Sequence, residues 1–148
     1  MEILPFFTSH YSVGESILTV EKEEEIKDDS SVSIFAIAKQ HGEDGVLIVD
    51  SDIAGYWKAY QNAKALGLQM TFGLKVVICA DVNDKTPESK LTESSIIIVF
   101  KNTQAYEDNV PIYSHASTLG KNDYRRLDWK NLTELSGNFF ILVPFYSS

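Results

Sequence analysis

The sequence predicts an α/β domain with a mainly parallel sheet and helices packed on it. Apolar runs of strand length alternate with segments whose apolar residues recur at three- and four-residue steps. Such alternation is typical of parallel strands joined by right-handed helical crossovers. The 148 residues are within the usual size of one domain, and no linker or repeat divides them. Residues 1–148 are therefore expected to form a single domain.

The first half of the chain has a clear pattern of strands and helices. GVLIVD is a compact run rich in β-branched residues, which suits a strand buried on both faces. Gly42 and Gly67 end the two helical segments, and Ser30 or Ser31 can cap the first of them. The expected elements are a strand at 3–7, a helix at 32–41, a strand at 45–50, a helix at 54–66 and a strand at 70–80.

The second half begins with a polar segment, residues 81–93, which is expected to be a hairpin connection. Asn102 can cap a helix of about residues 103–106, or a longer and less regular one. Asp128 is a plausible cap for the last helix, and Pro144 indicates that the last strand ends there or lies at an edge. The remaining expected elements are a strand at 94–101, a helix at 128–135 and a strand at 138–145.

Composition and charge disfavour several classes of protein. The net charge is −8, which makes autonomous binding to a phosphate backbone a poor expectation. Cys79 is the only cysteine, so neither an intrachain disulfide nor a zinc-cluster spacing is available, and a buried strand residue is expected. No signal-peptide pattern follows Met1, and no apolar run reaches the roughly 20 residues that span a bilayer. These features predict a cytoplasmic protein with no membrane association.

One basic segment with aromatic residues, KNDYRRLDW, has two interpretations. Tyr124, Arg125 and Arg126 could stack on bases or bind phosphates, which would give weak or indirect contact with nucleic acid. A surface turn before a helix is the alternative interpretation.

Two stretches of the chain are TSHYSVGES and GVLIVDSDIAGYWKAYQNAKALGLQMTFGLKVVI. Together they resemble the first and second motifs of the polymerase-and-histidinol-phosphatase (PHP) domain of bacterial DNA polymerase III alpha subunits. The later segments IIVFKNTQAYEDN and LDWKNLTELSGNFFILVPF also resemble the family, in the same order. The resemblance covers most of the chain and implies a β/α barrel. Because the family's domain is considerably longer, a partial or reduced barrel is expected.

The resemblance also implies that the family's metal ligands are largely lost. Its first histidines correspond to Leu4, Phe6 and Thr8, its later histidine to Ser51, and its glutamate to Lys75, whereas its aspartate is kept as Asp50. A multi-metal phosphoesterase site needs several converging histidines and carboxylates. We therefore expect a former metal pocket in which Lys75 replaces the cation beside Asp50. Its candidate residues are Thr8, His10, Asp50, Ser51, Asp52 and Lys75.

Two functions follow from the resemblance. The first is a metal-free, non-catalytic module without a cofactor, acting in DNA replication with other DNA polymerase subunits or with the remainder of a polymerase chain. The alternative is a metal-dependent phosphoesterase or 3′–5′ exonuclease. In that case His10, Asp50 and Asp52 would bind Zn or Mn, perhaps with ligands from a second chain.

Overall fold

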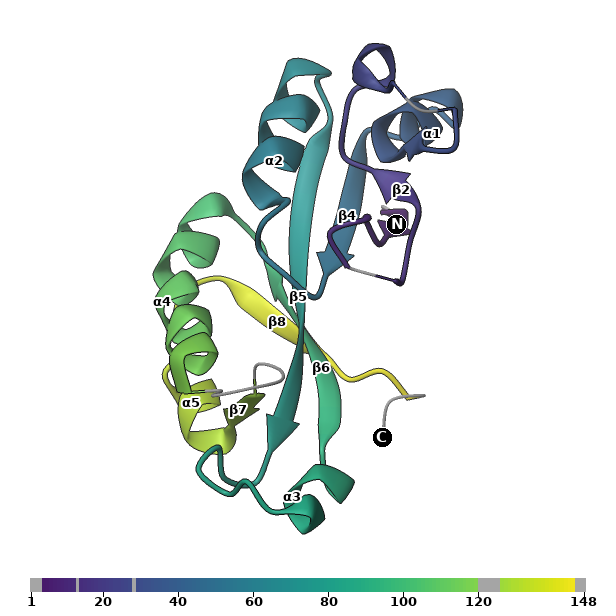
Figure 1. The fold of residues 1–148 in the computed structure, drawn as a ribbon. Helices are drawn as coiled ribbons and strands as arrows, with labels where there is room; N and C mark the ends of the chain where they lie inside the picture. Colours follow the sequence, from purple (N-terminus) through teal and green to yellow (C-terminus); the bar gives the residue numbers. More distant parts are fainter. Residues whose placement is uncertain (1–3, 13, 28, 120–125, 146–148) are drawn as a thin grey trace. The chain divides into compact units, whose positions relative to one another are not determined.

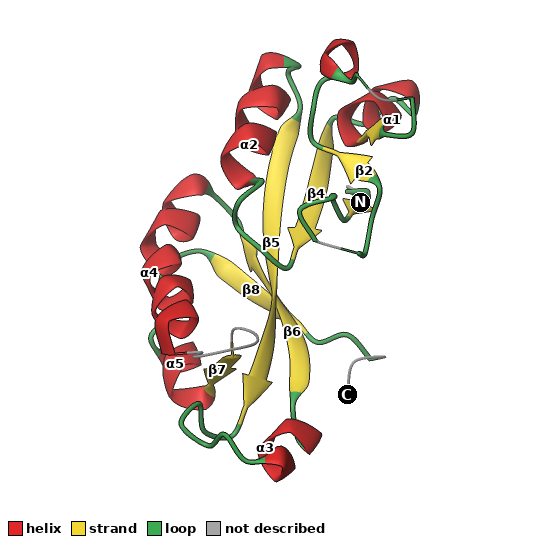
Figure 2. Cartoon of the chain, in the orientation of Figure 1, coloured by secondary structure: helices red, strands yellow, loops and turns green. Residues whose placement is uncertain are grey.

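The computed structural model describes residues 4–12, 14–27, 29–119 and 126–145, and it is a mixed α/β fold as predicted (Figures 1 and 2). Its chain contacts define two compact units, residues 1–74 and residues 75–148. Strand β5 (Gln69–Cys79) contributes residues to both units. The single domain stays a prediction.

The first unit contains a parallel sheet in the order β1-β4-β5. β1 spans Phe6–Phe7 and β4 spans Gly45–Asp50. β4 is almost completely buried, as its run of apolar residues predicts. Because β1 and β4 are parallel, their carboxyl ends lie at the same edge of the sheet. That edge is a common place for functional groups in α/β proteins.

Two helices complete the core of the first unit. α1 (Ile34–Gln40) buries Ile34 and Phe35, and α2 (Tyr56–Ala65) buries Tyr56. The ring of Tyr56 meets that of Phe72 on β5 edge-on, with the ring centroids 5.2 Å apart. Gly67 follows α2 with a φ of +70°, in the left-handed region that ends many helices.

Several boundaries in the first unit differ from the sequence prediction. The described part of the first strand is only Phe6–Phe7. Val32–Ser33 forms strand β3, which pairs in parallel with β2 (Leu18–Thr19) instead of starting a helix. The cap of α1 is therefore Ser33 and not Ser30 or Ser31, because the Ser33 hydroxyl accepts a hydrogen bond from the Ala36 amide. The charged segment also contains a short 3₁₀ helix, η1 (Glu23–Glu25).

The second unit combines antiparallel and parallel pairing. β6 (Ser94–Phe100) pairs with β8 (Phe139–Leu142) in antiparallel fashion, and β7 (Arg126–Asp128) pairs in parallel with the end of β5. Its helices are α3 (Pro87–Leu91), α4 (Thr103–Leu119) and α5 (Trp129–Thr133). The strands described do not close a barrel, so the barrel is not part of the observed fold.

The second unit also contains elements that the sequence prediction missed. The polar segment between β5 and β6 includes α3, which Thr86 caps by accepting from the Ser89 amide. The helix after Asn102 has its longer form and continues past Pro111. Strand β7 has only three residues, too few for a periodic pattern. Asp128 caps α5 as predicted, with Asn131 completing a capping box.

Helix α4 and the segment before β8 are joined by a buried amide. Asn109 is 2% exposed. Its side-chain nitrogen donates to the Ser136 carbonyl at 2.8 Å, and its side-chain oxygen accepts from the Ser136 amide at 3.0 Å. This reciprocal pair fixes where the chain enters β8, which pairs with β6 through Phe100↔Phe139 to Ile97↔Leu142.

Candidate functional site

The predicted site residue Asp50 lies at the carboxyl end of β4 and is bound by two serines from the segment after β1. The Ser9 amide donates to Asp50 Oδ1 at 2.8 Å, and the Ser9 hydroxyl donates to Oδ2 at 2.7 Å. The Ser12 hydroxyl donates to Oδ1 at 3.0 Å. Both carboxylate oxygens are therefore engaged by donors from the first unit.

This Ser9–Ser12–Asp50 cluster is closed to solvent. Asp50 and Ser12 are each 1% exposed, and Ser9 is 0% exposed. The hydroxyls also serve as acceptors, because the Tyr11 amide donates to Ser9 Oγ and the Ser51 amide donates to Ser12 Oγ. Because the cluster is closed to solvent, neither hydroxyl is accessible to a substrate. The arrangement satisfies a buried carboxylate without a cation.

The predicted site residues Asp52 and Ser51 form hydrogen bonds with residues outside the Ser9–Ser12–Asp50 cluster. Asp52 Oδ1 accepts from the Ala54 amide at 2.8 Å, which forms a local turn before α2. The Ser51 hydroxyl points to Glu15, at 3.4 Å from Oε1. Thr8 follows β1 and is partly buried. Gly55 lets the chain pass close to the Tyr11 ring, since a side chain at Gly55 would collide with that ring.

His10 is exposed and lies beside a surface hollow instead of the carboxylate. Its amide donates to the Leu18 carbonyl at 2.7 Å, and its ring packs 4.4 Å from that of Tyr11. The hollow has a volume of about 350 Å³ and is lined by His10, Ile17, Thr19, Ser30 and Ser31. The described residues of its lining include no carboxylate, so among them no acidic ligand accompanies the histidine.

The residues at this edge do not fit a catalytic metal. Across the described ranges, no three histidine, cysteine or acidic side chains are grouped so that they could hold a metal ion. This applies to His10, Asp50 and Asp52, which the phosphoesterase alternative requires. Zn and Mn sites need several such ligands at one point.

Lys75 is the first residue of the second unit and is partly buried. Its pairing with Asp50 would join the two units, so it stays a prediction. Within the first unit, Ser9 and Ser12 provide the hydrogen-bond donors to the Asp50 carboxylate.

Of the three residues predicted to contact nucleic acid, only Arg126 lies within the described ranges. Tyr124 and Arg125 are outside them. Arg126 is 8% exposed. Its guanidinium donates to Glu93 Oε1 at 2.9 Å, to Ser89 Oγ at 3.2 Å and to the Asp84 carbonyl at 2.8 Å. These contacts give Arg126 a structural role inside the second unit.

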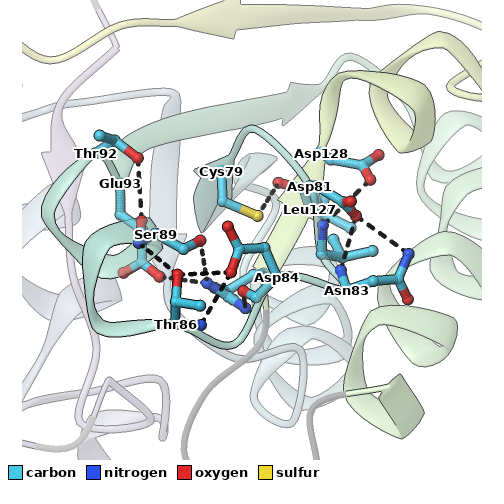
Figure 3. Close-up of polar contacts among 12 residues, drawn as sticks. Cys79, Asp81, Asn83, Asp84, Thr86, Ser89, Thr92, Glu93, Leu127 and Asp128 are labelled. Carbon is cyan, nitrogen blue, oxygen red and sulfur yellow. Dashed lines mark hydrogen bonds and ion pairs between the residues drawn. The ribbon is translucent and has the colours of Figure 1, made fainter.

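A polar network that includes Asp84, Thr86, Ser89 and Glu93 organises the segment between β5 and β6 (Figure 3). Asp84 accepts from the amide and hydroxyl of Thr86, at 3.0 and 2.7 Å, and these bonds hold the pKa of Asp84 below its ordinary value. Cys79 is buried, as predicted, and its thiol donates to the Leu127 carbonyl at 3.6 Å. Burial raises the pKa of the Cys79 thiol, which favours its neutral form.

An ion pair borders a second hollow in the first unit. Lys58 on α2 lies 2.5 Å from Glu21 Oε1, and the two residues line a surface depression of about 530 Å³ together with Thr19, Glu25, Ile26, Lys27 and Ser31. The hydrogen bond from Lys58 lowers the pKa of Glu21, and the same bond raises the pKa of Lys58.

This pair predicts a pH-dependent effect of Glu21→Gln. A lowered carboxyl pKa stabilises the folded state above the unfolded pKa, and that contribution is lost as pH falls through the folded pKa. The variant should melt slightly below the native chain at pH 7, by at most about 2 °C, because the pair is partly exposed.

The difference should shrink between pH 7 and an acidic pH at which Glu21 is protonated in the folded state as well as in the unfolded one. Thermal melts followed by circular dichroism at the two pH values measure it. Glu24→Gln is the matched control, since Glu24 is an exposed acid of the same 3₁₀ helix. A difference that persists unchanged at low pH would contradict the role of this pair.

Sequence reasoning missed Ser9 and Ser12 as the partners of Asp50. The available signal was their position, since both follow a strand that runs parallel to the strand ending in Asp50. Serine is common in turns, so the residue type alone does not distinguish a turn from a carboxylate-binding loop.

The chain was compared with known proteins. No family model matches the sequence, and no significant match was found among curated proteins. Within the part of the chain that is described, no helix is both long enough and apolar enough to cross a bilayer.

Proposed function

We propose that this chain is a metal-free, non-catalytic module of the PHP type, related to the N-terminal region of the bacterial DNA polymerase III alpha subunit. Its role is structural, through contact with other polymerase subunits or with the remainder of a polymerase chain in DNA replication. Under this proposal, the observed α/β fold is a partial or reduced form of the PHP barrel.

The state of Asp50 is the observation that carries this proposal. By resemblance, Asp50 is the one metal-binding residue of the family that this chain keeps. Its carboxylate accepts three hydrogen bonds from Ser9 and Ser12 and is 1% exposed. A carboxylate held in this way stabilises the segment after β1 and is withheld from a metal or a substrate.

No observation favours the phosphoesterase alternative. That reaction needs an accessible cation or nucleophile, whereas His10, Asp50 and Asp52 each have separate surroundings. The Arg126 guanidinium is also engaged inside the second unit, which removes one of the three residues proposed to contact nucleic acid.

Metal loading and phosphodiester hydrolysis test the non-catalytic part. The chain is incubated with excess Zn²⁺ or Mn²⁺, desalted, and analysed for metal and for hydrolysis of bis-p-nitrophenyl phosphate. We expect less than about 0.1 metal per chain and no metal-dependent rate. Stoichiometric metal, with hydrolysis that Asp50→Asn abolishes, would contradict the proposal.

Binding to purified subunits of a bacterial replicative polymerase tests the partner. The chain is immobilised, and each subunit is passed over it at physiological salt. Saturable binding of at least one subunit is expected, and failure of all of them to bind would contradict the proposed role. An acidic protein of similar net charge serves as the control for non-specific attraction.

A further inference from the structure

The two surface hollows of the first unit share part of their lining. Thr19 and Ser31 line both the larger hollow, of about 530 Å³, and the smaller one, of about 350 Å³. Every residue of the two linings belongs to residues 1–74, so the joint hollow is formed within one unit. Each volume is in the range of small-molecule sites, about 300–1,000 Å³.

The backbone along the joint hollow is held in place by buried contacts. Val20 is 0% exposed, and the side-chain nitrogen of Asn62 on α2 donates to its carbonyl at 2.8 Å. The Ser33 hydroxyl donates to the Glu21 carbonyl at 2.7 Å. These bonds position residues 18–21 before any ligand binds. A preformed wall of this kind lowers the free-energy cost of binding.

Thr19 offers a hydrogen-bond donor to the joint hollow from a buried position. The residue is 5% exposed, and its hydroxyl accepts from the Glu21 amide at 3.2 Å. Within the described ranges, this hydroxyl donates to no acceptor. Because a buried hydroxyl normally has a partner for its proton, an acceptor on a ligand, such as a carboxylate oxygen, would complete its hydrogen bonding.

The charges in the lining are balanced. Lys27 and Lys58 contribute two cations, and Glu21 and Glu25 contribute two carboxylates. Lys58 pairs with Glu21, whereas Lys27 and Glu25 are exposed and form no ion pair with a described residue. A ligand that carries one cation and one carboxylate can pair with both of them. A simple anion or cation would instead meet groups of its own sign.

We propose that the joint hollow binds a free α-amino acid with a polar side chain. The ligand's ammonium pairs with Glu25, and its carboxylate accepts from Lys27 and from the Thr19 hydroxyl. Its side chain lies in the smaller hollow, whose described lining is polar except for Ile17. An apolar side chain would leave the polar groups there without partners, so it binds less well. This site does not depend on the proposed function.

Thermal melts of the 148-residue chain test the site. Each common L-amino acid is added at about 10 mM, and a ligand that binds only the folded state raises the melting temperature. We expect serine, threonine, asparagine or glutamine to raise it by about 2 °C or more, and leucine and phenylalanine to leave it unchanged. If no amino acid raises the melting temperature, or if only the apolar ones do, the proposal is overturned.

Two derivatives of the best amino acid test the need for both charges. The N-acetyl form lacks the ammonium, and the amide lacks the carboxylate. Each should bind about tenfold more weakly or worse in calorimetric titrations, because each loses one charge-assisted pair. Either derivative binding as tightly as the free amino acid would overturn the proposal of a zwitterionic ligand.

Two variants at exposed positions test the placement of the ligand. Glu25→Gln and Lys27→Gln should each weaken binding by about tenfold or more, because each removes one of the pairing charges. Glu24→Gln is the matched control and should bind like the native chain, since Glu24 is an exposed acid of the same 3₁₀ helix outside the described lining. Circular dichroism establishes that each variant is folded. Native affinity in both Glu25→Gln and Lys27→Gln would overturn the assignment of this hollow.

Discussion

Asp50→Ala is expected to lower the free energy of unfolding by about 3 kcal/mol or more, which is the largest effect in the first unit. Removal of the carboxylate leaves the Ser9 amide and the two serine hydroxyls without their acceptor in a buried place. Each buried donor without a partner costs about 1–3 kcal/mol. The melting temperature should fall by about 10 °C.

Urea unfolding followed by tryptophan fluorescence measures the change in stability. Asp44→Ala is the matched control, because Asp44 is an exposed aspartate just before β4. It should change stability by no more than about 0.5 kcal/mol. Asp50→Asn should recover only part of the loss, since the amide nitrogen of asparagine faces donors where the carboxylate had an acceptor.

The outcome separates a structural aspartate from a catalytic one. Functional carboxylates commonly cost stability, so removing one leaves a protein unchanged or makes it more stable. If the free energy of unfolding of Asp50→Ala is within about 0.5 kcal/mol of the native value, the Ser9–Ser12–Asp50 cluster does not stabilise the segment after β1. The proposal of a rebuilt, non-catalytic pocket then loses its support.

The sequence predicted the elements whose signal is periodic or compact. β4 is a continuous apolar run with glycine before it, and α2 has helical spacing and ends at Gly67. Both are found within two residues of their expected limits. α1 begins at Ile34, two residues after its predicted start. Val32 and Ser33 pair with β2 instead, and such a tertiary contact leaves no local sequence pattern.

The sequence predicted only part of the site, because the contacts that form it are also tertiary. Asp50 was predicted from the family resemblance, in which it corresponds to an aspartate that is kept. Its partners Ser9 and Ser12 lie 41 and 38 residues away in the sequence, and the parallel pairing of β1 with β4 brings them to it. Arg126 was interpreted as a surface residue because KNDYRRLDW is polar, whereas strand β7 takes its side chain into the second unit.

Arg126→Met is expected to lower the free energy of unfolding by about 3 kcal/mol, the largest effect in the second unit. The side chains of Arg126 and Glu93 are only 7% and 14% exposed, at an N–O distance of 2.9 Å. Removing the guanidinium takes away the cation beside the partly buried Glu93 carboxylate, and it removes the donors to Ser89 and to the Asp84 carbonyl.

The double variant Arg126→Met/Glu93→Leu should recover most of the lost stability. Replacing both members of a buried ion pair with apolar residues removes the uncompensated charge, and such replacements are often neutral. Urea unfolding of the native chain, the two single variants and the double variant gives the coupling energy, which should exceed about 1 kcal/mol. Lys130→Met, at an exposed cation on α5, is the matched control and should be nearly neutral.

The same variant decides between the two interpretations of Arg126. If Arg126 binds phosphate at the surface, its replacement should leave stability unchanged. The slope of the affinity for single-stranded DNA against salt concentration should then fall by about one charge. If Arg126 instead anchors the segment between β5 and β6, its replacement should lower the stability of the second unit and leave any DNA binding unaltered. The burial of the guanidinium among three acceptors predicts the second result. An Arg126→Met variant that keeps native stability and loses DNA binding would overturn that assignment.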